Sequence, residues 1–219
     1  FLWFLFILAV PFLVYAAIAK AAGWKGPPKI LFLTPLVWLW LIPITAVVQW
    51  FHGLTMPGFG PDTALGLFPA PHIILLYAVY FFFGVFYFDC DDREGKLTRG
   101  WWIMLPLAVF GMYPLGISLT LQMSEPWARP LGVVCQVAFA WLMIFGLMGL
   151  FRKICSRESK VLRYISDSSY FLYIAHLPAI FWFQFWAKSL PTSAFVKFAL
   201  VSVTITALLL LIYQLVVRY

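Results

Sequence analysis

Long apolar runs separated by short polar connections are the feature that most constrains this chain. Seven windows are apolar and long enough to cross the hydrocarbon core of a bilayer, at about 1–19, 30–50, 72–88, 101–121, 132–151, 168–187 and 195–217. The alternating pattern of an outer-membrane β-barrel is missing. With 64% hydrophobic and 11% charged residues, the sequence predicts an all-α, polytopic transmembrane bundle that forms a single membrane domain over residues 1–219.

Lysine and arginine gather on one side of this predicted bundle. Twelve of the 15 lie in alternate connections, and the other side has only Arg129, Lys188 and Lys197. Because basic residues accumulate in cytoplasmic connections, we expect the C-terminus in the cytoplasm and Phe1 outside. Topology therefore explains the net charge of +7, and no nucleic-acid partner is expected. The apolar start without an initiator Met predicts that the true N-terminus is absent. With Phe1 outside, the topology predicts that an odd number of further spans precedes it.

One predicted span, in the run 165–186, carries an ionisable side chain near its middle. With Ser166 or Asp167 as the N-cap, His176 lies roughly 13 to 15 Å along the helix, near the bilayer midplane. Pro178 cannot donate a hydrogen bond, so a backbone carbonyl one turn from the ring is released. Ionisable groups at this depth are costly, which favours a functional role. A hydrogen bond to a neighbouring helix is the alternative.

Polar residues at helical spacing form one stripe on this span. Its members are Ser169, Tyr173, His176 and Gln184. A neutral imidazole can accept or donate a proton, and a neighbouring hydroxyl can orient the ring. We therefore take His176, Tyr173 and Ser169 as candidate catalytic residues.

Basic residues also gather before this span. The segment 151–165, FRKICSRESKVLRYI, combines five basic residues with an apolar face, which predicts a helix in the membrane interface. Arg152, Arg157 and Arg163 are candidates for binding the phosphates of a cytosolic donor, because guanidinium pairs bidentately with phosphate. A topogenic role against lipid headgroups is the alternative.

The residues between spans do not predict a metal site. His52, Asp62 and His72 are spread over 21 residues without the spacing of zinc ligands, which favours surface or interfacial histidines. The segment 89–96, DCDDREGK, resembles a calcium loop, but Arg93 occupies a ligand position. The three cysteines are widely spaced and predict neither a disulfide framework nor a zinc pattern.

Four segments resemble one family of membrane proteins. SDSSYFLYIAHLP (166–178) closely resembles the Ser-Tyr-x-x-Tyr-x-x-His-x-Pro segment of the acyltransferase-3 family. FLWFLFIL (1–8), FFFGVFYF (81–88) and LLIYQLVVRY (210–219) are similar to other spans of that family. The pattern looks closest to the branch that contains the glucans biosynthesis protein C enzymes. The resemblance covers the whole chain and is most specific around His176.

This resemblance implies a bundle of about ten spans, of which the chain would supply the last seven. It implies transfer of an acetyl, succinyl or similar acyl group from a cytosolic acyl-CoA to a hydroxyl of an extracytoplasmic glycan, in the bacterial inner membrane. Acyl-CoA is then the donor substrate, and no tightly bound cofactor is expected. The best-supported catalytic histidine of the family, on its first span, is not in this chain, so we expect His176 to support the reaction rather than to act as the principal base.

Two other classes of function stay open. A non-catalytic membrane subunit of a larger complex would keep the same fold and bury its apolar faces against other chains. A small-solute transporter is disfavoured, because no span centre carries Asp, Glu, Lys or Arg. Walker, G-x-S-x-G and H-E-x-x-H motifs are absent from the sequence.

Overall fold

The structure, a computed structural model, describes residues 2–24, 26–54, 58–64, 66, 68–122, 125–156 and 159–218. Every regular element within these ranges is helical, which confirms the predicted all-α class. By its internal contacts the chain divides into two compact units, residues 1–153 and 154–219. The single membrane domain over residues 1–219 stays a prediction.

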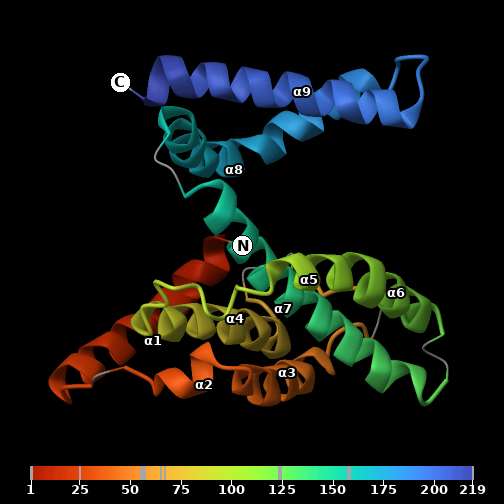
Figure 1. Cartoon of the computed structure of the whole chain (residues 1–219). Helices are drawn as coiled ribbons and strands as arrows, with labels where there is room; N and C mark the ends of the chain where they lie inside the picture. The colour runs from red at the N-terminus through yellow and green to blue at the C-terminus, as the bar shows by residue number, and fades with distance from the viewer. Residues whose placement is uncertain are drawn as a thin grey trace. The chain divides into compact units, whose positions relative to one another are not determined.

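The order of the helices can be followed by colour in Figure 1. The first unit contains α1 (Leu2–Ala21), α2 (Lys29–Leu33), α3 (Leu36–Gln49), α4 (Pro71–Asp89), α5 (Trp101–Pro106), the π-helix η1 (Leu107–Met112), α6 (Tyr113–Leu121) and α7 (Ala128–Ile154), whose last residue falls at the division. The second unit contains α8 (Lys160–Ala187), α9 (Ala194–Ile212) and the π-helix η2 (Tyr213–Val217).

Five helical stretches among the described residues are long and apolar enough to cross a membrane. They are Trp3–Ala21, Pro71–Asp89, Trp101–Leu121, Ala128–Ile154 and Ala194–Val217. The predicted span over 30–50 is interrupted, because Thr34 is extended and Pro35 follows it, which leaves α3 with 14 residues. Helix α8 has 28 residues, but its polar stripe lowers its hydropathy and it is not among the five. Seven spans and their orientation stay predictions.

The start of α8 differs from the sequence-based expectation. An N-cap at Ser166 or Asp167 is wrong, because the helix begins at Lys160. The hydroxyl of Ser169 donates to the Ser166 carbonyl at 2.7 Å, and such bonds let serines lie inside a helix. His176 therefore lies roughly 24 Å from the start of the helix. The separate interfacial helix over 151–165 is also wrong, since its described residues end α7 and begin α8.

Aromatic side chains on α7 form the centre of the core of the first unit. Trp141 and Phe145 are almost completely buried. The Trp141 ring lies 4.8 Å from the Phe83 ring on α4, and the Phe145 ring lies 5.3 Å from the Trp38 ring on α3, measured between centroids. The Trp141 indole N–H donates to Thr45 Oγ1 at 3.0 Å. Helix α7 therefore packs α3 and α4 around one centre.

A buried hydrogen-bond network joins three helices of this unit to a loop. Gln49 Nε2 on α3 donates to Gln136 Oε1 on α7 at 2.8 Å. Gln136 Nε2 donates to Thr120 Oγ1 on α6 at 3.4 Å, and the Gly60 N–H donates to Gln136 Oε1 at 3.4 Å. Both glutamines are buried. The network therefore satisfies amides that would otherwise be unpaired in an apolar core, and it fixes the loop at Gly60.

The second unit packs α8 against α9 through one apolar stripe. Val201, Ile205 and Leu209 on α9 follow one another at four-residue spacing and are buried. The partners on α8 are Phe171, Leu172, Ala175, Ala179, Ile180 and Phe183. Near the start of α8 and the end of α9, the Tyr164 hydroxyl donates to the Leu210 carbonyl at 3.4 Å. This packing fixes which face of α8 meets α9.

The packing of α7 against the start of α5 predicts that adding a methyl group at Gly149 will destabilise the protein. A Cβ at Gly149 would lie 2.4 Å from the Thr98 carbonyl oxygen and 2.6 Å from Trp101 Cβ. Because the carbonyl belongs to the backbone, Gly149→Ala is expected to destabilise the first unit by about 1–3 kcal/mol. The measurement is the thermal unfolding midpoint, Tm, of the purified protein in detergent.

Gly84 on α4 provides the matched control. A Cβ there meets nothing within 4 Å, and alanine is favoured over glycine in a helix by about 1 kcal/mol. Gly84→Ala should therefore keep or raise Tm. Equal Tm values for the two variants would contradict the packing at Gly149.

Candidate functional site

A groove between α8 and α9 contains the histidine singled out from the sequence. The groove has a volume of about 510 Å³. Helix α8 contributes Leu172, His176, Ile180 and Gln184, which follow one another at four-residue spacing. Helix α9 contributes Ala194, Lys197, Phe198, Val201, Ser202, Ile205, Thr206 and Leu209. The imidazole of His176 is thus half-buried beside a hollow that has both polar and apolar walls.

The hydrogen bonds of His176 define its tautomer. Nδ1 lies 3.2 Å from the Leu172 carbonyl oxygen and 2.5 Å from the Tyr173 carbonyl oxygen. A carbonyl can only accept, so Nδ1 carries the hydrogen and Nε2 of the neutral ring carries the lone pair. Nε2 has no protein partner among the described residues. The ring is therefore held by its own helix and keeps one nitrogen for a ligand.

The two predicted partners of His176 lie at different distances from it. The ring of Tyr173 is 5.7 Å from the His176 ring, between centroids, and is 42% exposed. Ser169 is exposed, and its hydroxyl donates to the Ser166 carbonyl within the same helix. Neither residue lines the groove. Tyr173 thus contacts the histidine, whereas Ser169 is two turns away from it.

Sequence reasoning missed the contribution of α9 to this groove. Lys197 Nζ donates to the Lys188 carbonyl at 3.2 Å, where α8 is connected to α9. Thr206 Oγ1 donates to the Ser202 carbonyl at 2.8 Å. The available signal was the pair Ser202 and Thr206, because small polar residues four apart in an apolar helix are frequent at helix contacts.

The three candidate phosphate ligands belong to different parts of the chain. Arg152 lies in the first unit and Arg163 in the second, and Arg157 lies outside the described residues. Arg152 Nη1 donates to the Asp92 carbonyl at 2.7 Å. Its side chain is exposed. Arg152 thus packs on the connection between α4 and α5, and phosphate binding stays a prediction for all three residues.

The connection beneath Arg152 is organised by a carboxylate. Partial burial raises the pKa of Asp92, but the N–H groups of Lys96 and Leu97, the Tyr87 hydroxyl and the Arg152 charge together lower that pKa below its ordinary value of 3.8. The Lys96 N–H and the Tyr87 hydroxyl each lie 2.9 Å from a carboxylate oxygen. These bonds stabilise the ionised form. The charge of Asp92 therefore stabilises the fold of the α4–α5 connection.

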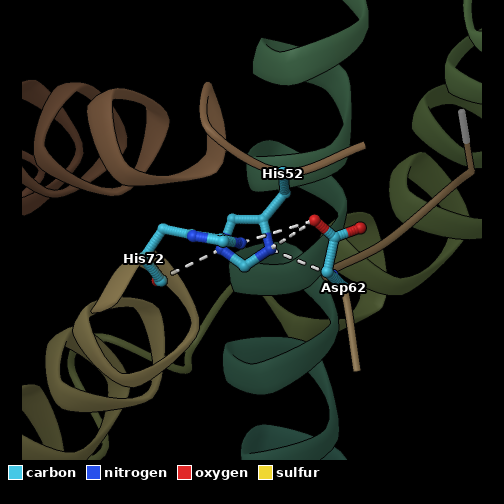
Figure 2. A group of neighbouring side chains, drawn as sticks. All are labelled: His52, Asp62 and His72. Atoms are coloured by element: carbon cyan, nitrogen blue, oxygen red, sulfur yellow. Dashed lines mark hydrogen bonds and ion pairs between the residues drawn. The ribbon is translucent and has the colours of Figure 1, made fainter. Parts of the chain in front are cut away.

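A second polar cluster joins the loop after α3 to the start of α4. Figure 2 shows His52, Asp62 and His72 pointing toward one another. The Asp62 N–H donates to His52 Nδ1 at 2.9 Å, so Nε2 carries the hydrogen and donates to the His72 carbonyl at 3.2 Å. Asp62 Oδ2 lies 3.6 Å from His72 Nε2.

This cluster corrects the sequence-based interpretation. The expectation of a surface histidine is wrong for His52, because this residue is only 4% exposed. His72 is half-buried. The Gly53 N–H donates to both carboxylate oxygens of Asp62, each at 3.1 Å, and thereby closes the loop on itself. Residues ten apart therefore meet through a loop closure that local spacing does not reveal.

The helices and their composition define an integral membrane protein built from apolar helices. The family model described as "Acyltransferase domain" matches residues 1–213, and the chain belongs to the acyltransferase-3 family. The match confirms the family resemblance and indicates a membrane acyltransferase. The branch of the glucans biosynthesis protein C enzymes stays a prediction. A search of curated proteins and a search of solved structures found no significant match.

The pKa of Asp92 predicts how stability changes in acid. In Asp92→Asn one carboxylate oxygen becomes an NH₂ group that cannot accept, which should cost about 1–3 kcal/mol at pH 7. Because the folded pKa is lowered, the unfolded chain binds the proton first, and the advantage of the wild type is lost as pH falls through 3.8 and the folded pKa. Tm measured between pH 7 and pH 3 checks this.

Asp91→Asn is the control for this measurement. Asp91 is exposed and its carboxylate pairs with exposed Arg93, so its removal should change Tm little. A constant difference in Tm between the wild type and Asp92→Asn over this pH range would refute the role of the charge.

Proposed function

We propose that this chain belongs to an O-acyltransferase that moves an acetyl or succinyl group from cytosolic acyl-CoA to a hydroxyl of an extracytoplasmic glycan. The acceptor oxygen forms a bond to the thioester carbonyl carbon while the carbon–sulfur bond breaks. The hydroxyl proton ends on the sulfur of released CoA. The protein would act in the bacterial inner membrane, with the lipid bilayer, acyl-CoA and the glycan as its partners.

The observation that carries this proposal is the open nitrogen of His176 inside a chain of this family. Nδ1–H is bonded to the helix and Nε2 keeps its lone pair beside the groove. An acceptor hydroxyl can donate a hydrogen bond to Nε2, which orients and polarises its oxygen for attack. His176 thus supports the reaction by positioning the acceptor, and Tyr173 packs beside its ring.

The predicted topology gives the two ends of α8 different partners. Arg163 lies near the start of the helix, on the side predicted to be cytoplasmic, and Arg152 belongs to the same predicted side. Both remain proposed ligands of the CoA phosphates, together with Arg157. Lys188 and Lys197 line the groove near the α8–α9 connection, which is predicted to lie outside. Their positive charge favours an acceptor that carries negative charge.

Replacing His176 tests the proposal. In the full-length protein, His176→Ala is expected to lower glycan acylation by about 10²-fold, because the acceptor hydroxyl loses its hydrogen bond to Nε2. The measurement is the transfer of radiolabelled acyl groups from acyl-CoA to glycan in membrane vesicles. Size-exclusion chromatography and Tm establish that the variant folds.

Leu177→Ala is the matched control on the neighbouring residue. Leu177 is 55% exposed and does not line the groove, so its truncation should leave acyl transfer unchanged. Full activity of a folded His176→Ala variant would remove His176 from the site. A wild-type protein that transfers no acyl group would instead favour the non-catalytic membrane subunit.

A further inference from the structure

We propose that His52, Asp62 and His72 bind one divalent transition-metal ion of the zinc class. The three residues offer two imidazole nitrogens and one carboxylate oxygen, with no two of these atoms more than 4.8 Å apart. Two imidazoles and a carboxylate are a common protein donor set for Zn²⁺, whereas Mg²⁺ and Ca²⁺ prefer oxygen ligands. The proposal does not depend on the acyltransferase reaction.

The distances between donor atoms are close to those of a metal site. His52 Nδ1 and Asp62 Oδ2 are 3.8 Å apart, and His72 Nε2 and Asp62 Oδ2 are 3.6 Å apart. Two ligands of a tetrahedral zinc ion are about 3.3 Å apart, given bonds of about 2.0–2.1 Å. These two separations exceed that value by roughly half an ångström or less. The donor atoms of His52 and His72 lie within 4.8 Å of each other. A movement of the His72 ring, together with a small movement of the loop that carries Asp62, would complete the geometry.

The hydrogen bonds around the cluster prepare its atoms for a cation. The bond from His52 Nε2–H to the His72 carbonyl leaves the lone pair on Nδ1, which lies on the side of Asp62. Metal-binding histidines use such bonds through their second nitrogen to fix tautomer and ring orientation. The Gly53 N–H likewise orients the Asp62 carboxylate. These bonds therefore fix the tautomer of His52 and orient the Asp62 carboxylate before a metal arrives.

Two interactions oppose the metal, and both can be offset. The Asp62 N–H occupies the Nδ1 lone pair of His52 and must turn away when a metal binds. His72 is in the first turn of α4, where the helix dipole places partial positive charge. The full negative charge of Asp62 opposes this partial positive charge. Metal coordination also replaces the lost hydrogen bond at the same nitrogen.

The exposure of the three residues leaves one side of the site open. His52 is buried behind the cluster, while Asp62 and His72 line a hollow of about 520 Å³. Phe51, Phe59 and Thr63 also line this hollow. Three protein ligands and an open side are the arrangement of zinc sites that keep a fourth, exchangeable position. A water molecule or a small anion would occupy it.

Metal titration of the whole purified protein tests this inference. For this titration the protein is purified with an affinity tag that contains no histidine, and bound metal is removed by dialysis. Isothermal titration with ZnCl₂ should show one saturable site, and Co²⁺ should give visible absorption that changes when azide is added to the open position. MgCl₂ and CaCl₂ should give no saturable heat. The absence of a saturable Zn²⁺ site would overturn the proposal.

Three substitutions assign the site to its residues. Asp62→Asn and His72→Gln should each weaken Zn²⁺ binding at least tenfold. His176→Gln is the control, because it removes a histidine from another part of the chain and should leave Zn²⁺ binding unchanged. His72→Gln decides the question if Asp62→Asn fails to fold, since the His72 carbonyl that binds His52 is retained. Equal binding by His72→Gln and the wild type, or a loss only in His176→Gln, would refute the assignment.

Discussion

The cost of leaving a polar group unpaired among apolar side chains governs this structure. Hydrocarbon offers no hydrogen bonds, so each polar atom inside the bundle requires a partner from the chain itself. Trp141 donates to Thr45, and Gln49 donates to Gln136, which in turn binds Thr120. These pairs join α3, α6 and α7 at fixed positions. Polar residues in the first unit therefore help to specify which helices are neighbours, and aromatic side chains pack at the centre of its core.

His176 meets the same requirement with only one of its two nitrogens. Its Nδ1–H is satisfied by carbonyls of its own helix, and Nε2 faces no protein donor among the described residues. The groove beside it contains the side chains of Gln184, Ser202 and Thr206. An unsatisfied acceptor is tolerated where water or substrate can reach it. Under the proposed function, this nitrogen would accept a hydrogen bond from the acceptor hydroxyl.

The sequence predicted the all-α class because apolar runs of membrane length have few other structures available. Helix limits were less predictable: the hydroxyls of Ser168 and Ser169 bond within their helix, so α8 begins at Lys160 instead of at a serine cap. His176 was predicted as a functional residue because placing an ionisable side chain in an apolar span costs free energy. The His52–Asp62–His72 cluster was not, because a loop closure through Gly53 brings it together. Contacts such as Gln49–Gln136, 87 residues apart, have no local signal.

The tautomer of His176 in a lipid bilayer tests the central claim most directly. Solid-state ¹⁵N NMR of histidine-labelled protein identifies the His176 signals as those missing from His176→Gln. An open acceptor nitrogen predicts a protonated Nδ1 and an unprotonated Nε2, with magnetisation transfer from water to the ring. A hydrogen on Nε2, or a ring that receives no magnetisation from water, would contradict a ligand-binding role for this histidine.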